Sequence, residues 1–229
     1  MRVAIVTKYD KKPIEKVLKK FNFRVVNKNP DVVLTYGGDG TILYSERMFP
    51  SVPKLIVKYK SSICRKCDYS FKDLEGLLEK LSKGEFKVLE EMKLEAKFKD
   101  KRLIALNEIQ IHNKLPTKAI RFSVWVDGKK FENLIGDGVI IATPFGSTAY
   151  YSSTGGKPFK KGIGISFNNL FRKRIKSFVV RENSKIKVRV EKGPALLLAD
   201  NLERFIELKE GDEVLVKKAE ARAKLIFFS

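Results

Sequence analysis

The stretch Tyr36-Gly37-Gly38-Asp39-Gly40-Thr41 decides the fold of the first part of this chain. It follows an apolar run, residues 32–34, and leads into a segment with helical character, residues 41–48. A strand that enters a glycine turn and leaves as a helix brings free backbone N–H groups and the positive end of the helix dipole to one point. This arrangement favours phosphate, although Gly-Asp-Gly alone is also common in ordinary turns.

Asp39 is unexpected in a simple phosphate cradle, because its carboxylate repels phosphate oxygens. Two roles remain open from the residues alone. In one, a divalent metal bridges the carboxylate and the phosphates. In the other, Asp39 faces an incoming hydroxyl as a general base. Both interpretations predict phosphoryl transfer.

Strands and helices alternate through residues 1–85. The hydrophobic pattern predicts strands at residues 2–7, 24–26, 31–36 and 54–57, and helices at residues 13–20, 41–48 and 71–81. Gly84 stands where a glycine commonly ends a helix. The alternation predicts a Rossmann-like α/β domain with a mainly parallel sheet, in which ligands bind at the carboxyl ends of the strands, where the glycine turn lies.

The pattern changes near Phe86, with no linker between the two parts. Short strands are expected at residues 86–91, 94–98, 103–106, 109–112, 120–126, 130–134, 139–142, 164–167, 178–180, 185–190, 195–198, 204–208, 213–217 and 223–228. Asp127-Gly128 is a strong hairpin signal between two of them. Many short strands with turn signals predict a second, all-β and sandwich-like domain over residues 86–220.

The composition bounds the class of protein. With 43% hydrophobic residues the chain can form a real core, and no apolar stretch approaches the length of a membrane span. The first strand is too short for a signal peptide, so we expect a cytoplasmic protein. The net charge of +20 is spread along the whole chain, which favours a solvated, thermophile-like surface that attracts anionic nucleotides over nucleic-acid binding.

Two further stretches carry polar groups beside apolar runs. Asn107-Glu108 form either a turn or a pair that faces a ligand. Residues 136–150 read Gly-Asp-Gly-Val-Ile-Ile-Ala-Thr-Pro-Phe-Gly-Ser-Thr-Ala-Tyr. This pattern predicts a glycine turn, a buried strand and then a polar turn before a short helix. Ser147 or Thr148 is expected to cap that helix. Their hydroxyls and N–H groups suit a sugar phosphate, and Tyr150 offers a ring for stacking on a base.

Cys64 and Cys67 have the Cys-x-x-Cys spacing of half a zinc site. They are the only cysteines and His112 is the only histidine, so Cys and His alone cannot complete four ligands. A redox pair, a disulfide of the kind that hyperthermophile proteins contain, and two ordinary cysteines near a loop all remain open. The sequence assigns the pair no function.

In three motifs the chain resembles NAD kinases, the ATP-dependent enzymes that phosphorylate the 2′-hydroxyl of the adenosine ribose of NAD. The motifs are residues 37–41, Asn107-Glu108, and residues 136–150 followed by Gly155-Gly156. Diacylglycerol kinases and 6-phosphofructokinases share the glycine turn, whereas the long third motif is specific to NAD-kinase-like proteins. The resemblance covers nearly the whole chain, and it implies that the final strand, residues 221–229, returns to the first domain.

The resemblance implies a role for each matching residue. Asp39 is the base that takes the 2′-hydroxyl proton, and Asp137 binds the nicotinamide end. The phosphates are held by Gly37, Gly38, Gly40 and Thr41, the substrate nucleotide is bound by Asn107 and Glu108, and the adenosine pocket is lined by Thr148, Ala149, Tyr150 and Ser153. The resemblance also implies that the ligands are NAD and ATP, that a divalent metal (Mg²⁺ or Mn²⁺) accompanies ATP, and that the protein is a homo-oligomer, either a dimer or a tetramer.

The sequence departs from the family pattern around the substrate pocket. Phe145 replaces a threonine of the third motif, Ile135 stands where many members have a basic residue, and Asp200-Asn201-Leu202 is the nearest match to an Asp-Gly-Gln. Tyr59 and the cysteine segment follow a strand after which many members have Gly-Ile-Asn and Leu-Gly-Phe-Leu-Thr. The alternative is therefore a kinase of the same fold that acts on another small hydroxyl substrate. If NAD is the substrate, Asn107, Asp137 and Tyr150 should converge on one pocket within reach of Asp39.

Overall fold

The computed structural model describes residues 1–228, and these form two compact units. Unit 1 contains Met1–Glu91 and the chain from Ala221 onward, and unit 2 contains Met92–Glu220. The division falls further along the chain than the boundary expected near Phe86. Two long strands, β6 (Lys87–Phe98) and β17 (Glu213–Phe227), each contribute residues to both units.

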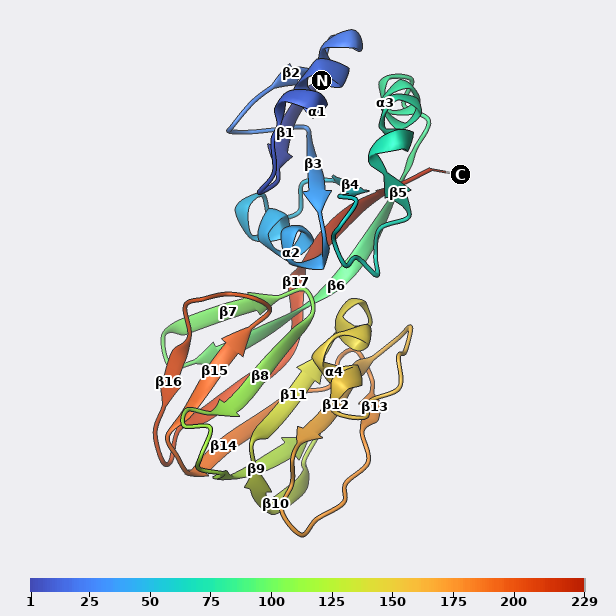
Figure 1. The fold of residues 1–229 in the computed structure, drawn as a ribbon. Helices are drawn as coiled ribbons and strands as arrows, with labels where there is room; N and C mark the ends of the chain where they lie inside the picture. The colour runs from blue at the N-terminus through green and yellow to red at the C-terminus, as the bar shows by residue number, and fades with distance from the viewer. Residues whose placement is uncertain (229) are drawn as a thin grey trace. The chain divides into compact units, whose positions relative to one another are not determined.

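Unit 1 is a parallel sheet with helices packed on it (Figure 1). Its elements are β1 (Arg2–Val6), α1 (Lys12–Lys20), β2 (Arg24–Val25), β3 (Val32–Gly37), α2 (Asp39–Met48), β4 (Lys54–Lys58), β5 (Tyr69–Ser70), the 3-10 helix η1 (Phe71–Asp73) and α3 (Leu74–Ser82). The strand order is β2-β1-β3-β4-β17, with β5 also paired to β4, and every one of these pairings is parallel. The expected mainly parallel sheet is therefore present.

The helices of unit 1 bury the residues that their periodicity predicts. Ile14 and Leu18 of α1 are fully buried, and α3 buries a stripe of four leucines at residues 74, 77, 78 and 81. Burying such a stripe stabilises the folded state by about 25 cal/mol for each Å² of apolar surface that is removed from water. Gly84 follows α3 with a φ of +73°, the left-handed conformation expected after a helix.

Unit 2 consists of two antiparallel sheets that enclose one apolar core (Figure 1). The elements before the first helices are β7 (Lys101–Ala105), β8 (Glu108–Asn113), β9 (Ile120–Val126), β10 (Lys129–Gly136) and β11 (Gly138–Ala142). They are followed by η2 (Phe145–Thr148), α4 (Tyr150–Ser153), β12 (Ile163–Asn168), β13 (Phe178–Val180), β14 (Ile186–Lys192), β15 (Ala195–Ala199) and β16 (Ile206–Leu208). One sheet has the order β13-β12-β11-β8-β15-β16; the other contains β10-β9-β14-β17 with β6 and β7.

Several local predictions are confirmed, and others need correction. Asp127 and Gly128 both have positive φ, 48° and 88°, as the hairpin between β9 and β10 requires. The helix predicted at residues 41–48 begins at Asp39, and the strand predicted at residues 204–208 begins at Ile206. The strand predicted at residues 221–229 is part of β17, which pairs with β4 at Leu225; its last residue, Ser229, lies outside the described residues.

A buried ion pair supports the edge of unit 1 opposite the glycine turn. The side chain of Lys54 is fully buried at the start of β4 and pairs with Glu46 of α2. Lys54 Nζ also donates to the carbonyl oxygens of Phe49 and Val52, both at 2.7 Å, and Glu46 Oε1 accepts the N–H of Ser51 at 3.0 Å. These bonds fix the turn between α2 and β4.

We predict that Lys54→Met lowers the free energy of unfolding by about 3–5 kcal/mol, because it leaves the Glu46 carboxylate buried without its partner. The double variant Lys54→Met/Glu46→Leu should recover most of this loss. Urea denaturation of the three proteins measures the effect. Lys83→Met, which removes one partner of the exposed Lys83–Glu79 pair, is the control and should change stability little. A Lys54→Met protein as stable as the wild type would show that the pair does not support the turn.

Candidate functional site

The glycine turn of unit 1 is as compact as its sequence requires. A Cβ on Gly37 would lie 2.2 Å from Thr41 Oγ1, and a Cβ on Gly38 would lie 2.5 Å from the carbonyl oxygen of Ile63. The N–H of Thr41 donates to the oxygen of Gly38 at 2.9 Å, so the chain enters α2 directly after the turn. A side chain at Gly38 would collide with the backbone of Ile63, and one at Gly37 would collide with the side chain of Thr41, which explains why both positions are glycine.

Asp39 is the first residue of α2, and its carboxylate is half-buried. It accepts the backbone N–H of Arg65, at 3.1 Å to Oδ1 and 3.2 Å to Oδ2. The N–H of Asp39 in turn donates to the oxygen of Ile63 at 3.3 Å. A negative charge in the first turn of a helix also interacts favourably with the helix dipole. The carboxylate is therefore held in one orientation, because hydrogen bonds fix both the side chain and the main chain of Asp39.

The cysteine segment, residues 61–68, supplies these contacts. Cys64 and Cys67 form a disulfide, with their Cα atoms 5.5 Å apart. Among residues 1–228, no group of three or more His, Cys, Asp or Glu side chains lies close enough together to hold a metal ion. Of the alternatives that the sequence leaves open, the disulfide is the one found. The sequence does not reveal that this segment packs on the glycine turn.

Three tyrosine rings lie beside the same turn. Tyr59, directly after β4, stacks on Tyr9, with ring centroids 3.6 Å apart and planes inclined by 12°. Both rings contact Tyr36 edge-on, and burial is the main cause of the raised pKa of the Tyr36 phenol. The N–H of Tyr59 donates to the oxygen of Gly37 at 3.2 Å. Tyr59, one of the residues at which this sequence differs from the family pattern, therefore forms a cluster of aromatic rings with Tyr9 and Tyr36 next to the turn.

In unit 2, Asn107 and Glu108 lie where β8 begins, beside the polar turn that follows β11. Thr143 joins the two segments: its N–H donates to the oxygen of Asn107 at 2.9 Å, and its hydroxyl donates to the oxygen of Leu106 at 2.6 Å. A Cβ on Gly146 would lie 2.2 Å from the Asn107 oxygen. The second motif and part of the third are thus brought together by tertiary contacts.

Asp200 holds the first residues of β8 from the other side. Its carboxylate accepts three backbone N–H groups, from Leu106 at 2.8 Å, Asn107 at 2.7 Å and Glu108 at 3.2 Å. The N–H of Asp200 donates to the oxygen of Glu108 at 3.0 Å. The sequence pattern marks Asp200 only as part of an incomplete motif match and does not indicate this role. The available signal was an acidic residue just after the apolar run 195–199.

Glu108 is a buried acid with an unusual environment. Its side chain is almost completely buried, and within residues 1–228 its Oε2 has no hydrogen-bond partner. Burial, and secondly the charge of Asp200, raise the pKa of Glu108 to about 8, while a hydrogen bond with Gln110 acts in the opposite direction. At pH 7 the Glu108 carboxyl is therefore mainly protonated and has an O–H to donate.

The helical end of the third motif differs from the prediction. The N-cap position of α4 is occupied by Ala149, so the prediction that Ser147 or Thr148 is the N-cap residue is wrong. The Ser147 hydroxyl instead donates to the oxygen of Pro144 at 2.8 Å, inside η2. Tyr150 is 59% exposed, with its ring available for contact, and it lies on the same short segment as Thr148, Ala149 and Ser153.

Tyr151, unlike the exposed Tyr150 before it, is a residue of the core. Its ring is buried, and a Cβ on Gly156 would lie 2.2 Å from that ring. Phe159 contacts the ring edge-on. Gly156, the second of the two glycines after the third motif, thus makes room for a core tyrosine, and Gly155 adopts a positive φ of 89°. At Gly156 the absence of a side chain therefore serves the packing of the core.

Asp137 lies far from Asn107 within one chain. Its carboxylate accepts from the Nδ2 atoms of Asn113 (3.2 Å) and Asn169 (3.0 Å). The pairing of β11 with β8 sets Gly138 opposite His112 and Ala142 opposite Glu108. At about 3.3 Å per residue, Asp137 and Asn107 are separated by nearly the length of these strands. The expected convergence of Asp137 with Asn107 on one pocket does not occur within unit 2.

The other departures have structural explanations. Phe145 is buried within η2, 4% exposed, so it extends the packing below the polar turn. Ile135 is half-buried on β10, and its oxygen accepts the N–H of Phe171 at 2.8 Å.

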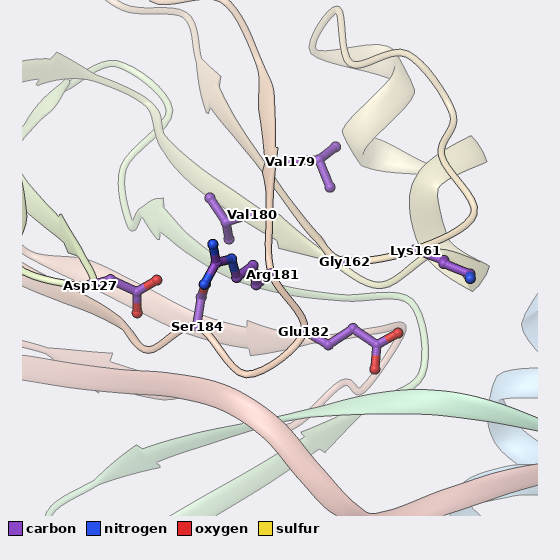
Figure 2. Close-up of a pocket in the computed structure, with 8 residues that line it drawn as sticks. All are labelled: Asp127, Lys161, Gly162, Val179, Val180, Arg181, Glu182 and Ser184. Atoms are coloured by element: carbon purple, nitrogen blue, oxygen red, sulfur yellow. The ribbon is translucent and has the colours of Figure 1, made fainter.

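A cavity of about 650 Å³ lies elsewhere in unit 2 (Figure 2). It is lined by Asp127, Lys161, Gly162, Val179, Val180, Arg181, Glu182 and Ser184. Figure 2 shows Arg181 beside Asp127 and Ser184, with Lys161 and Glu182 at the other side. None of the predicted site residues lines this cavity. No helix among residues 1–228 has the length and hydropathy to cross a membrane.

Comparison with known proteins connects these features to one family. The family described as "ATP-NAD kinase C-terminal domain" matches residues 106–228. An NAD kinase of Sulfurisphaera tokodaii is 32% identical over the whole chain and 96% of its own length. A crystal structure of an NAD kinase from Archaeoglobus fulgidus in complex with ATP has a TM-score of 0.86 and 30% identity, and the match covers the whole of this chain and 94% of that one.

A bifunctional NADP phosphatase/NAD kinase of Methanococcus maripaludis is 31% identical over 85% of this chain. This chain spans only 36% of that longer protein. The family description covers more than half of the chain, and the Sulfurisphaera relative matches all of it. The chain, with its compact Gly-Gly-Asp-Gly-Thr turn and its Asn107-Glu108 pair, therefore belongs to the NAD kinase family.

Proposed function

We propose that this chain is an NAD kinase, which transfers the γ-phosphoryl group of ATP to the 2′-hydroxyl of the adenosine ribose of NAD. The observation that carries the proposal is Asp39, a carboxylate held at the start of a helix directly after a glycine turn. Membership of the family supports the choice of NAD and ATP as ligands, and the positive net charge attracts both.

In the proposed mechanism, unit 1 supplies the phosphate site and the base. Gly37, Gly38, Gly40 and Thr41 form the turn that receives phosphate oxygens. Phosphoryl transfer has a loose transition state, so positioning and charge neutralisation account for most of the rate. Asp39 orients the attacking hydroxyl and accepts its proton late in the transfer. The hydrogen bond from Arg65 leaves lone pairs on both carboxylate oxygens for this purpose.

A divalent metal, Mg²⁺ or Mn²⁺, accompanies ATP in this proposal. The described residues offer Asp39 near the phosphate turn but no cluster of three or more acidic or His/Cys ligands, which fits a metal carried mainly by the phosphates of ATP. When bound, the metal neutralises phosphate charge. The chain's own contribution is the placement of Asp39 and of the backbone N–H groups.

Unit 2 supplies the groups proposed to recognise the nucleotide. Asn107 and protonated Glu108 hydrogen-bond the sugar, with Glu108 Oε2–H as a donor that no described protein atom uses. Tyr150 stacks on the adenine base beside Thr148, Ala149 and Ser153, and Asp137 contacts the nicotinamide end. The last role needs either an extended dinucleotide or a second copy of the chain, because Asp137 is remote from Asn107. We propose a cytoplasmic homo-oligomer, either a dimer or a tetramer.

A second candidate is a kinase of the same fold that acts on another hydroxyl metabolite. Phe145 is the observation in its favour, because its buried ring replaces a polar residue of the third motif. Incubating the purified protein with ATP, Mg²⁺ and NAD, and measuring NADP with an NADP-specific dehydrogenase, separates the two. ATP consumption that requires a pool of other hydroxylated metabolites, with no NADP formed, supports the second candidate.

We predict that Asp39→Asn lowers kcat for NADP formation by about 10²–10⁴-fold, the usual contribution of a general base. The amide keeps the size of the side chain and still accepts the Arg65 N–H but cannot take a proton. Asp10→Asn is the matched control, since Asp10 also accepts a backbone N–H at the start of a helix, from Lys12 at 3.0 Å. Its kcat should equal that of the wild type. An Asp39→Asn enzyme with undiminished kcat would remove Asp39 from the role of base.

We predict that the KM for NAD rises with pH through the pKa of Glu108, about 8, because Glu108 loses its donor O–H when it ionises. The sign follows from the raised pKa: the neutral acid is populated below pH 8 and disappears above it. Glu108→Gln keeps an N–H donor at all pH values, so its KM should lose this dependence. Asp200→Asn removes a neighbouring negative charge and should move the rise to lower pH. An identical pH profile in wild type and Glu108→Gln would contradict the donor role.

A further inference from the structure

We propose that the disulfide-closed cysteine segment, residues 61–68, is a positioning element for Asp39, acting through the backbone N–H of Arg65. The proposal rests on the proposed function, because it concerns how the base of that reaction is oriented. Nothing in the three motifs requires two cysteines at this place. Their position beside the glycine turn gives them a role that the sequence alone did not reveal.

The segment contacts the turn at successive points of its backbone. The oxygen of Ile63 accepts the Asp39 N–H at 3.3 Å and lies 2.5 Å from the position of a Cβ on Gly38. Two residues later, the N–H of Arg65 donates to both carboxylate oxygens of Asp39. The segment therefore holds Asp39 by its main chain and by its side chain. A shift of the segment therefore moves the Asp39 carboxylate as well.

The disulfide acts directly on the residue that makes the second contact. Arg65 lies inside the small ring that the Cys64–Cys67 bond closes, so the bond limits the backbone angles of Arg65 itself. At the start of the segment, Ser62 donates its N–H to the oxygen of Tyr59 at 2.9 Å, and its hydroxyl lies 3.2 Å from the Tyr9 hydroxyl. The Ile63 side chain is 83% exposed and adds little packing.

Opening the disulfide should therefore release Arg65 and let Asp39 rotate. The chemical step is thiol–disulfide exchange with an added dithiol such as dithiothreitol: two electrons and two protons pass to the cysteine sulfurs, and the dithiol becomes a cyclic disulfide. A catalytic group that loses its orientation costs rate more than substrate affinity. We expect reduction to lower kcat with little change in the KM for ATP.

The first experiment compares the oxidised and reduced enzyme. After treatment with dithiothreitol, thiol titration should find two new thiols, and kcat should fall about tenfold, in line with the cost of a misplaced catalytic group. The variant Cys64→Ser/Cys67→Ser should have the low kcat of the reduced enzyme and no response to dithiothreitol. An unchanged or higher kcat after complete reduction would overturn the proposal, as would two free thiols and bound zinc in the protein purified without reductant.

A pair of variants at Arg65 separates the N–H from the side chain. Arg65→Pro removes the donor and leaves the disulfide in place, whereas Arg65→Ala removes the side chain and keeps the donor. We expect kcat of Arg65→Pro to lie at least about fivefold below that of Arg65→Ala, consistent with loss of a charge-assisted hydrogen bond. Equal kcat values in the two variants, with unchanged melting temperatures, would exclude the N–H as a positioning group.

Amide hydrogen exchange provides a readout that does not depend on activity. Peptides that cover residues 61–68 and the start of α2 should exchange faster in the reduced protein, while peptides from β8 and β11 of unit 2 should not change. If the exchange responds but no NADP forms in any state, the positioning role stands and the proposed reaction is wrong. If NADP forms and the exchange does not respond to reduction, the positioning role is wrong.

Discussion

The close approach of backbone segments at the glycine turn is the constraint on which unit 1 depends. With glycine at positions 37 and 38, the oxygen of Ile63 and the side chain of Thr41 occupy the space that two Cβ atoms would fill. That contact lets α2 begin at Asp39 at the carboxyl end of β3. The orientation of the Asp39 carboxylate and the position of the cysteine segment depend on this contact. A phosphate site needs this compactness because its ligand is bound by backbone N–H groups.

In unit 2, a carboxylate holds the backbone of the candidate site in place. Asp200 accepts the N–H groups of Leu106 and Asn107, which precede β8, and of Glu108, its first residue. Thr143 and Gly146 close the other side by hydrogen bonding and by close approach. The result is that Glu108 is held almost completely buried, next to a second acid. Its raised pKa is a consequence of that scaffold, and the scaffold determines whether the residue accepts or donates a hydrogen bond.

A few charged side chains enter the interior of both units, Glu46 and Lys54 in unit 1 and Lys93, Glu95 and Glu108 in unit 2. Most of the 47 basic residues are at the surface, as the dispersed pattern predicted. Lys54 is an exception, because it is completely buried at the start of β4. The sequence pattern predicted this strand from its apolar residues and gave no sign that its first residue, a lysine, would be buried. Hydropathy along the chain could not anticipate this, because Lys54 is buried by its pairing with Glu46, a residue of a different element.

The sequence by itself determined the alternation of strands and helices in unit 1, the antiparallel strands of unit 2, the hairpin at Asp127-Gly128 and the three motifs that identify the family. These are local patterns, set by side-chain periodicity and by turn residues. Only the tertiary structure decided which residues meet: Arg65 with Asp39, Asp200 with Asn107 and Glu108, and Asp137 at the far end of β11. Such meetings depend on the register of strands and the path of loops, which many distant contacts fix together and no short stretch of sequence encodes.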